Sequence, residues 1–285
     1  MKQSAPLIIV RGAGDLASGV LAAIHISGFR VLALETENPS AIRRTVAFSE
    51  AVRLGHCTIE GIEARLIAKE QAAAVVSAGT GTAAAAEGSC SGFIPIAVDP
   101  AGELIEALHP AAVVDAIIAK KNCGTHLGMA PLVIALGPGF TAGTDAHVVI
   151  ETVRGHNLAR LIYQGAALPN TGVPGLVGGE SALRVIHAPT DGTLYVLRDI
   201  GSTVTRGEII ARVIHPDGNV TDVSASITGI IRGMLPDGFI VRSGLKMADI
   251  DPRLTELNNC FTISDKARAL GGSVLTALLS HGIVP

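Results

Sequence analysis

Two glycines and two acidic residues near the N-terminus have the spacing of a phosphate-binding turn. Gly12 and Gly14 follow the apolar run Leu7–Arg11, and Asp15 opens a segment with helical periodicity. A second apolar run ends at Glu35, about 20 residues further on, where an acid can accept hydrogen bonds from ribose hydroxyls. Because glycine amides and a helix N-terminus bind phosphate, the sequence predicts a ligand site here.

The same residues allow a purely structural interpretation. Ala17 stands where the dinucleotide-binding pattern has its third glycine. Gly12 and Gly14 would then serve only a tight turn between strand and helix. Asp15 can cap the helix, but its charge would repel a phosphate. Both interpretations stay open at this point.

A pair of arginines follows the second apolar run. Arg43 and Arg44 lie in the segment AIRRTVAFSEAV, a few residues after Glu35. Beside a nucleotide they could bind a phosphate or carboxylate through paired hydrogen bonds. The alternative is a solvated helix face.

Further polar residues follow later apolar runs. If the strand beginning at Val113 continues, Asp115 and Lys121 fall on one of its faces and could bind substrate or exchange protons. A pair of surface lysines, Lys120 and Lys121, is the plainer explanation. Cys123 is adjacent, and we expect it to be a buried, inert thiol.

The segment LGPGFTAGTDAHVVIETVRGH combines glycines with ionisable residues. Gly137 and Gly139, with Gly143, could form an anion-binding nest of backbone amides. His147 and Glu151 alternate onto one face of the following strand, which favours a polar substrate-binding cluster. The spacing matches no helical metalloprotease motif, so we assign no metal ligand.

Short apolar runs alternate with helical or alanine-rich segments over residues 1–182. This order predicts an α/β domain with a Rossmann-like, mostly parallel sheet. The runs that we expect to form its strands are Leu7–Arg11, Val31–Leu34, Phe93–Val98, Val113–Ile118, Leu132–Leu136 and Val148–Ile150.

Residues 183–255 have a different character, with short β-rich runs separated by Asp-Gly turns. Their pattern resembles the barrel-sandwich hybrid of lipoyl and biotinyl carriers. Carriers bear a modified lysine on the central hairpin, and residues 214–224 contain no lysine. We therefore expect a partner-binding or site-covering module. Residues 256–285 return to helical spacing and should pack back on the α/β domain, with Gly271 and Gly272 serving close packing or a ligand.

Composition excludes several classes of function. The chain has 285 residues, with 22 basic and 25 acidic, and it lacks the basic patch and aromatic platforms of nucleic-acid-binding proteins. No apolar stretch reaches the ~20 residues that a membrane span requires, and the N-terminus shows no signal-peptide pattern. The cysteines, Cys57, Cys90, Cys123 and Cys260, form no CxxC pair. We expect a cytoplasmic protein with reduced thiols.

Several motifs in fixed order resemble one known family. They are RGAGDLASGV, ETENPSAIRRTVAFSEAV, VVDAIIAKKN, LGPGFTAGTDAHVVIETVRGH, PNTGVPG, KMADIDPR and ISDKARALGGSVL. Together they resemble the YqeB-type accessory proteins of the selenium-dependent molybdenum hydroxylase system. The resemblance implies a role in maturing such an enzyme, installing labile selenium or sulfur at its cofactor. It implies a client hydroxylase as partner and supplies no catalytic residue.

Three functions agree with these observations. The first is a maturation factor that binds a nucleotide or pterin-phosphate ligand, with a dinucleotide or molybdenum cofactor as the candidate cofactors. The second is an NAD(P)-dependent oxidoreductase with Glu35 on the ribose and Lys121 or His147 as acid–base group. The third is a non-catalytic regulatory scaffold that binds a nucleotide. Homo-oligomerisation stays open in all three.

Overall fold

The computed structural model describes residues 5–78, 92–170, 172 and 178–285, and Cys90 and part of PNTGVPG lie outside them. The chain divides into two compact units. Unit 1 comprises residues 1–39, 47–170 and 263–285, and unit 2 comprises residues 40–46 and 171–262. The sequence-based division placed its boundaries after residues 182 and 255 instead.

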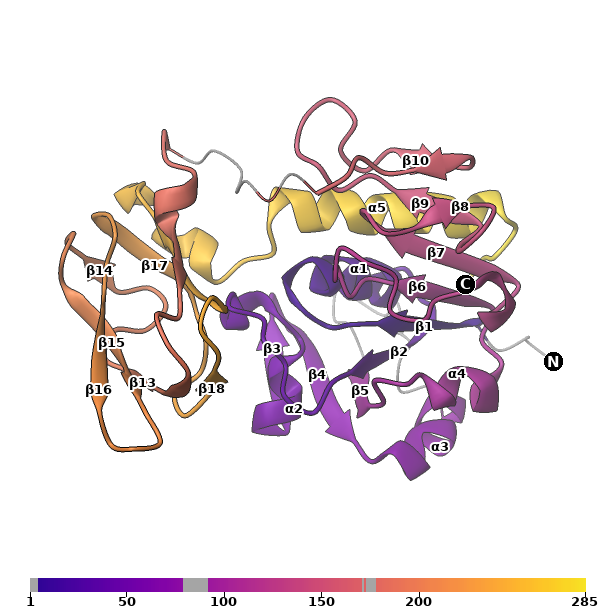
Figure 1. Cartoon of the computed structure of the whole chain (residues 1–285). Helices are drawn as coiled ribbons and strands as arrows, with labels where there is room; N and C mark the ends of the chain where they lie inside the picture. Colours follow the sequence, from indigo (N-terminus) through magenta and orange to yellow (C-terminus); the bar gives the residue numbers. More distant parts are fainter. Residues whose placement is uncertain (1–4, 79–91, 171, 173–177) are drawn as a thin grey trace. The chain divides into compact units, whose positions relative to one another are not determined.

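Unit 1 is built on a nine-stranded sheet with the order β10-β9-β7-β6-β1-β2-β5-β4-β3 (Figure 1). Its central strands are parallel and consist mainly of buried apolar residues, as expected for a sheet covered on both faces. The strands are β1 (Leu7–Arg11), β2 (Arg30–Glu35), β3 (His56–Ile59), β4 (Ile62–Ile67), β5 (Ile94–Val98), β6 (Ala112–Asp115), β7 (Leu132–Leu136), β9 (Val148–Ile150) and β10 (Leu161–Ile162).

This sheet corrects the predicted fold class, because it is mixed and not a Rossmann-like sheet. Strand β3 runs antiparallel to β4, and β10 runs antiparallel to β9. Within residues 116–147 the connections from β6 to β7 and from β7 to β9 contain no α-helix. Apolar runs predict buried strands but leave strand direction and helix cover undefined. The β3–β4 hairpin reverses the chain at Glu60 and Gly61, whose φ angles are 50° and 80°.

Alternating side chains of the strands build a core on each face of the sheet. Ile8 and Val10 face a core shared with α1 (Asp15–Ile26), α2 (Glu50–Leu54) and α5 (Asp265–Ser280). Leu7 and Ile9 face the opposite core, shared with α3 (Ala72–Ser77) and α4 (Glu103–Leu108). Over β7 and β9, the short strands β8 (Thr141–Ala142) and β11 (Gly165–Ala166) and their loops replace helices as cover.

Helices α1 and α5 lie in direct backbone contact (Figure 1). Gly19 faces Ala267 so closely that any Cβ at Gly19 would overlap the Ala267 backbone. A Cβ at Gly271 would lie 2.5 Å from the Gly19 carbonyl oxygen, whereas one at Gly272 would meet nothing within 4 Å. Of the adjacent glycines in α5, Gly271 is therefore required by packing and Gly272 is not.

We predict opposite effects for two neighbouring substitutions in α5. Gly271→Ala should lower the free energy of unfolding by about 1–3 kcal/mol, since overpacking forces the helices apart. Gly272→Ala should raise it by up to ~1 kcal/mol, because alanine has the higher helix propensity. Urea unfolding of both variants measures the difference, and equal effects would contradict the assigned contact.

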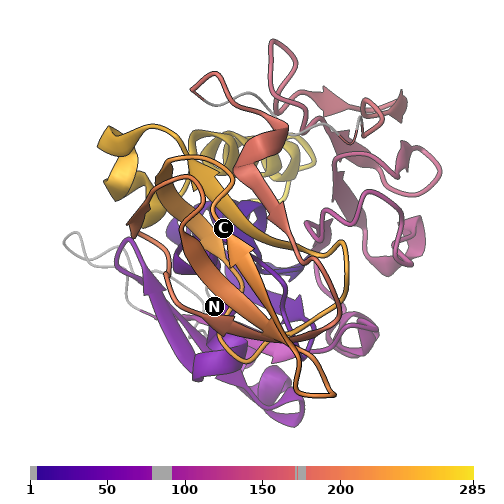
Figure 2. The ribbon, with the colours of Figure 1, turned by 60° about the vertical axis from the view of Figure 1, so that its left-hand side comes forward.

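Unit 2 consists mainly of two four-stranded antiparallel sheets, with the orders β12-β19-β17-β14 and β16-β15-β13-β18 (Figure 2). This finding replaces the predicted barrel-sandwich-hybrid-like module, because the repeated turns predict hairpins without specifying how the strands combine. The strands are β12 (Val185–His187), β13 (Gly192–Val196), β14 (Thr203–Val204), β15 (Ile209–Ile214), β16 (Val220–Ser224), β17 (Gly229–Met234), β18 (Ile240–Val241) and β19 (Lys246–Asp251).

Short 3-10 helices complete the two units. They are η1 (Arg44–Val46), η2 (Lys69–Gln71), η3 (Leu127–Met129), η4 (Ala182–Arg184) and η5 (Leu254–Cys260). Among the described residues, no helix is both long and apolar enough to cross a membrane.

Candidate functional site

The turn between β1 and α1 is shaped by the close approach of neighbouring loops. Gly12 has a φ of 93°, and its N–H donates to the Leu34 carbonyl over 2.7 Å. A Cβ at Gly12 would lie 3.1 Å from the Ala116 carbonyl oxygen, which follows β6. Gly14 is the N-cap of α1 and supplies no side-chain cap, and Asp15 is the first helical residue. The fold therefore requires a glycine at position 12, whether or not a ligand binds.

Glu35 reaches back to the same turn. Its Oε2 accepts the Ala13 N–H over 2.8 Å, and its Oε1 accepts the Thr36 N–H over 2.8 Å. The Ala13 carbonyl in turn accepts the Ser49 N–H over 2.8 Å. The carboxylate predicted to bind a ribose therefore has a second role, because it holds the backbone of the turn.

We predict that Glu35→Ala lowers the free energy of unfolding by about 1–3 kcal/mol, because the partly buried Ala13 N–H loses its acceptor. Glu35→Gln keeps an acceptor oxygen and should cost clearly less. Thermal and urea unfolding of the two variants test this difference. Equal stability of Glu35→Ala and the parent chain would contradict the structural role.

A buried polar cluster lies where β1 and β6 end. Arg11 and Asp115 are both almost fully buried, with the Arg11 Nη1 3.4 Å from the Asp115 Oδ2. The Thr125 hydroxyl donates to the same Oδ2 over 2.6 Å, and Arg11 Nη2 donates to the Cys123 carbonyl over 3.0 Å. Burial raises the pKa of Asp115, against the lowering effect of the Thr125 hydrogen bond and of Arg11. The cluster holds the loop after β6 in place.

That loop corrects the placement predicted for Lys121. Strand β6 ends at Asp115, and the chain then turns with positive φ at Ile118 and Lys120, so Asp115 and Lys121 share no strand face. Lys121 is exposed. Cys123 is an exposed free thiol, contrary to the predicted buried one.

The raised pKa of Asp115 makes the stability of unit 1 depend on pH. A carboxyl whose folded-state pKa is raised stabilises the fold below its unfolded pKa of about 3.9, and this contribution is lost as pH rises through the folded value. Between these two pH values, unit 1 should lose stability relative to the Asp115→Asn variant.

Asp99 provides a matched control. Burial opposes ionisation there, but hydrogen bonds from the Leu104 N–H and Lys69 lower its pKa. Stability from Asp99 is present above the unfolded pKa and is lost as pH falls through the folded one. In urea unfolding across pH 3–7, the parent should lose stability relative to Asp99→Asn as pH falls below about 3.9, and relative to Asp115→Asn as pH rises above about 3.9. Changes in the reverse direction would contradict the assignment.

The glycines expected to form an anion nest take part in packing. The Gly137 N–H donates to the Ile150 carbonyl over 2.9 Å, and the Gly143 N–H donates to the Ala146 carbonyl over 2.8 Å. A Cβ at Gly139 would lie 2.6 Å from the Lys121 Cα. Two of the three N–H groups therefore already donate to backbone carbonyls. Gly139 has no side chain, which allows the loop that carries Lys121 to pack against it.

His147 and Glu151 lie at opposite ends of β9. His147 precedes the strand, and its Nδ1 accepts the Val133 N–H over 2.9 Å. Glu151 follows the strand and is buried, and its two oxygens accept backbone N–H groups of Thr152, Val153 and Leu168. The predicted polar cluster is not formed by this pair. Among the described residues, no group of three or more His, Cys, Asp or Glu side chains could hold a metal ion.

Arg43 and Arg44 belong to unit 2, whereas the residues of the β1–α1 turn belong to unit 1. Arg43 Nη2 donates to the Asn259 carbonyl over 3.0 Å. Arg44 Nε donates to the Met234 carbonyl over 2.7 Å, and its Nη2 is 2.6 Å from the Asp199 Oδ1. Their contacts attach residues 40–46 to unit 2.

A lysine that the sequence analysis did not single out lies near the start of α1. Lys266 is half-buried in the first turn of α5, whose next residue, Ala267, packs on Gly19 of α1. Burial lowers its pKa, and the charge of Arg154 acts in the same direction. The carboxylates of Asp15, Glu151 and Asp265 partly offset this effect. In the described part of the chain, Lys266 has no hydrogen bond or ion pair within 4.0 Å.

The positive charge of Lys266 offsets the negative charge of Asp15 at the start of α1. The acid at the start of α1 would repel a phosphate, but Lys266 places a positive charge in its electrostatic range. A half-buried ammonium beside backbone N–H groups can bind an anion, or act as a base after losing its proton. The signal available in the sequence was the Ser-Asp-Lys start of the last helix, Ser264 being the N-cap that accepts the Ala267 N–H.

Comparison with known proteins gives one close relative. The chain is 47% identical over 283 residues to the protein named uncharacterized protein YqeB from Escherichia coli (strain K12). The match is a similarity in sequence to that protein. It covers 98% of the chain and 49% of the relative, so the chain spans about half the length of the curated YqeB protein that it matches. No family model matches the chain.

Solved structures are similar only at a distance. The ectoine utilization protein EutE (DoeB) from Ruegeria pomeroyi is 10% identical, with 87% of this chain and 85% of that chain covered and a TM-score of 0.27. A succinylglutamate desuccinylase from Silicibacter sp. TM1040 is 12% identical, with 87% and 85% covered and a TM-score of 0.26. Scores this low support no inference about activity.

Proposed function

We propose that the chain is an accessory protein in the maturation of a selenium-dependent molybdenum hydroxylase, and that unit 1 binds a nucleotide or pterin-phosphate ligand at the start of α1. The observation that carries the ligand site is Lys266, a half-buried cation with no partner among the described residues, next to a helix N-terminus without a side-chain cap. The biological role is supported by the ordered motifs, through their resemblance to the YqeB-type accessory proteins, and the 47% identity to the YqeB protein agrees with that resemblance.

The contacts of Glu35 favour this function over hydride transfer. Both carboxylate oxygens already accept N–H groups from Ala13 and Thr36, which leaves fewer lone pairs for ribose hydroxyls. His147 accepts the Val133 N–H at the amino end of β9, so it is no candidate acid–base group at the turn. Lys266 and the turn instead offer an anion-binding role that requires no redox cofactor.

Ligand binding can be tested on the full chain. Mass spectrometry of the small molecules retained after purification identifies the ligand class, and calorimetry with inorganic phosphate and nucleoside monophosphates measures affinity. Lys266→Gln should weaken binding at least about tenfold, the usual effect of losing one charge-assisted hydrogen bond. Gly14→Val should block the approach of the ligand to the backbone.

The matched control is Lys246→Gln, which removes the same charge from unit 2 and should leave affinity unchanged. Equal binding by the parent, Lys266→Gln and Gly14→Val would rule out the site. The maturation role has a separate readout, which is the molybdenum and selenium content of a client hydroxylase from cells with and without this chain. Identical content would refute that role while leaving the ligand site standing.

A further inference from the structure

A cavity lies in unit 1 at the amino ends of β1, β2, β6 and β7, whereas the β1–α1 turn lies at the carboxyl end of β1. Its volume is about 650 Å³, within the usual range for small-molecule sites. It is lined by Leu7 and Arg30, the first residues of β1 and β2, and by residues 109–111 and 128–131, which directly precede β6 and β7. None of the residues predicted from the sequence to bind a ligand lines this cavity.

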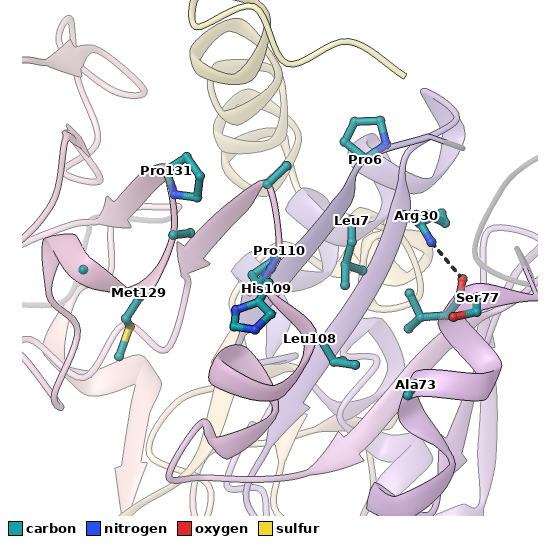
Figure 3. Close-up of a pocket in the computed structure, with 14 residues that line it drawn as sticks. Pro6, Leu7, Arg30, Ala73, Ser77, Leu108, His109, Pro110, Met129 and Pro131 are labelled. Atoms are coloured by element: carbon teal, nitrogen blue, oxygen red, sulfur yellow. Dashed lines mark hydrogen bonds between the residues drawn. The ribbon is translucent and has the colours of Figure 1, made fainter. Parts of the chain in front are cut away.

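Most of the described side chains that line the cavity are apolar, whereas polar atoms make up the larger part of its accessible surface. Figure 3 shows Arg30 and Ser77 at one end, Met129 and Pro131 at the other, and Leu7 between them. No aspartate or glutamate is among these lining residues, and the ionisable ones are Arg30 and His109. A cavity with this composition is complementary to an anion attached to an apolar body.

Arg30 is held in a fixed position at its end of the cavity. Its Nη1 donates to the Val76 carbonyl over 3.5 Å, near the end of α3, and its Nε donates to the Ala5 carbonyl. The Nη2 group has no hydrogen-bond acceptor among the described residues. The guanidinium is therefore oriented before any ligand arrives, which reduces the entropy that binding would cost.

The helix ends near the cavity act in the opposite direction. Helices α3 and α4 end at Ser77 and Leu108, and a helix C-terminus has a partial negative charge that disfavours an anion. Both helices have only six residues, and Arg30 donates to the Val76 carbonyl at the end of α3. The full charge of a fixed arginine outweighs these partial charges.

We propose that this cavity binds a small organic anion with a flat or branched apolar body, its acidic group on Arg30 and its body between Leu7 and Met129. The site is separate from the ligand site at the start of α1 and does not depend on the function proposed above. It would let the chain respond to a second small molecule.

The test compares 2-naphthoate with its neutral amide, 2-naphthamide, by calorimetry on the full chain. The acid should bind at least about tenfold more tightly than the amide, as expected for one charge-assisted hydrogen bond. Arg30→Gln should remove this difference, and Arg30→Lys should restore part of it. Arg53→Gln, which removes an exposed arginine of α2, is the matched control and should change nothing.

A blocking variant keeps the test decisive if Arg30→Gln fails to fold. Ala73 lines the cavity from α3 and is exposed, so Ala73→Phe should fill the space and abolish binding of both probes. Equal affinity for the acid and the amide, binding that survives Ala73→Phe, or no binding at millimolar concentration would each overturn the proposal.

Discussion

The contact between α1 and α5 is the constraint on which the arrangement of unit 1 depends. Gly19 and Gly271 let two helix backbones meet without side chains between them, although the helices are separated by more than 200 residues of sequence. The contact completes the core on one face of the sheet. It also fixes the first turn of α5 beside the start of α1, so the position of Lys266 follows from a packing requirement between glycines.

Several ionisable side chains of unit 1, buried or partly buried, hold loops in place. Glu35 binds the β1–α1 turn, Asp115 and Arg11 bind the loop after β6, and Glu151 binds three N–H groups after β9. In each case an ionisable side chain at a strand end satisfies backbone groups that the sheet leaves unpaired. Such positions look like catalytic candidates in a sequence, because both roles require polar residues next to apolar strands.

How much of the fold and of the site could be predicted depends on what each sequence pattern specifies. The central strands and the last helix were recognisable because their apolar residues recur with the period of the element. Strands β3 and β10 were not predicted. The turn at Glu60 and Gly61 sets the direction of β3, residues 151–160 reverse the chain between β9 and β10, and no apolar pattern indicates either reversal. Arg43 and Arg44 follow Glu35 in sequence, yet their hydrogen-bond partners are more than 150 residues away. Lys266 was missed because its environment is created by helix packing.

The division of the chain has a consequence for how the protein is made. The backbone passes between the two units four times, after residues 39, 46, 170 and 262. Residues 263–285 supply α5, so during synthesis α5 cannot cover the apolar face of α1 and the sheet until residues 171–262 of unit 2 have been translated. Unit 2 itself needs residues 40–46, which emerge more than 120 residues before the rest of it. Neither unit is a contiguous segment that could be copied, exchanged or inherited on its own.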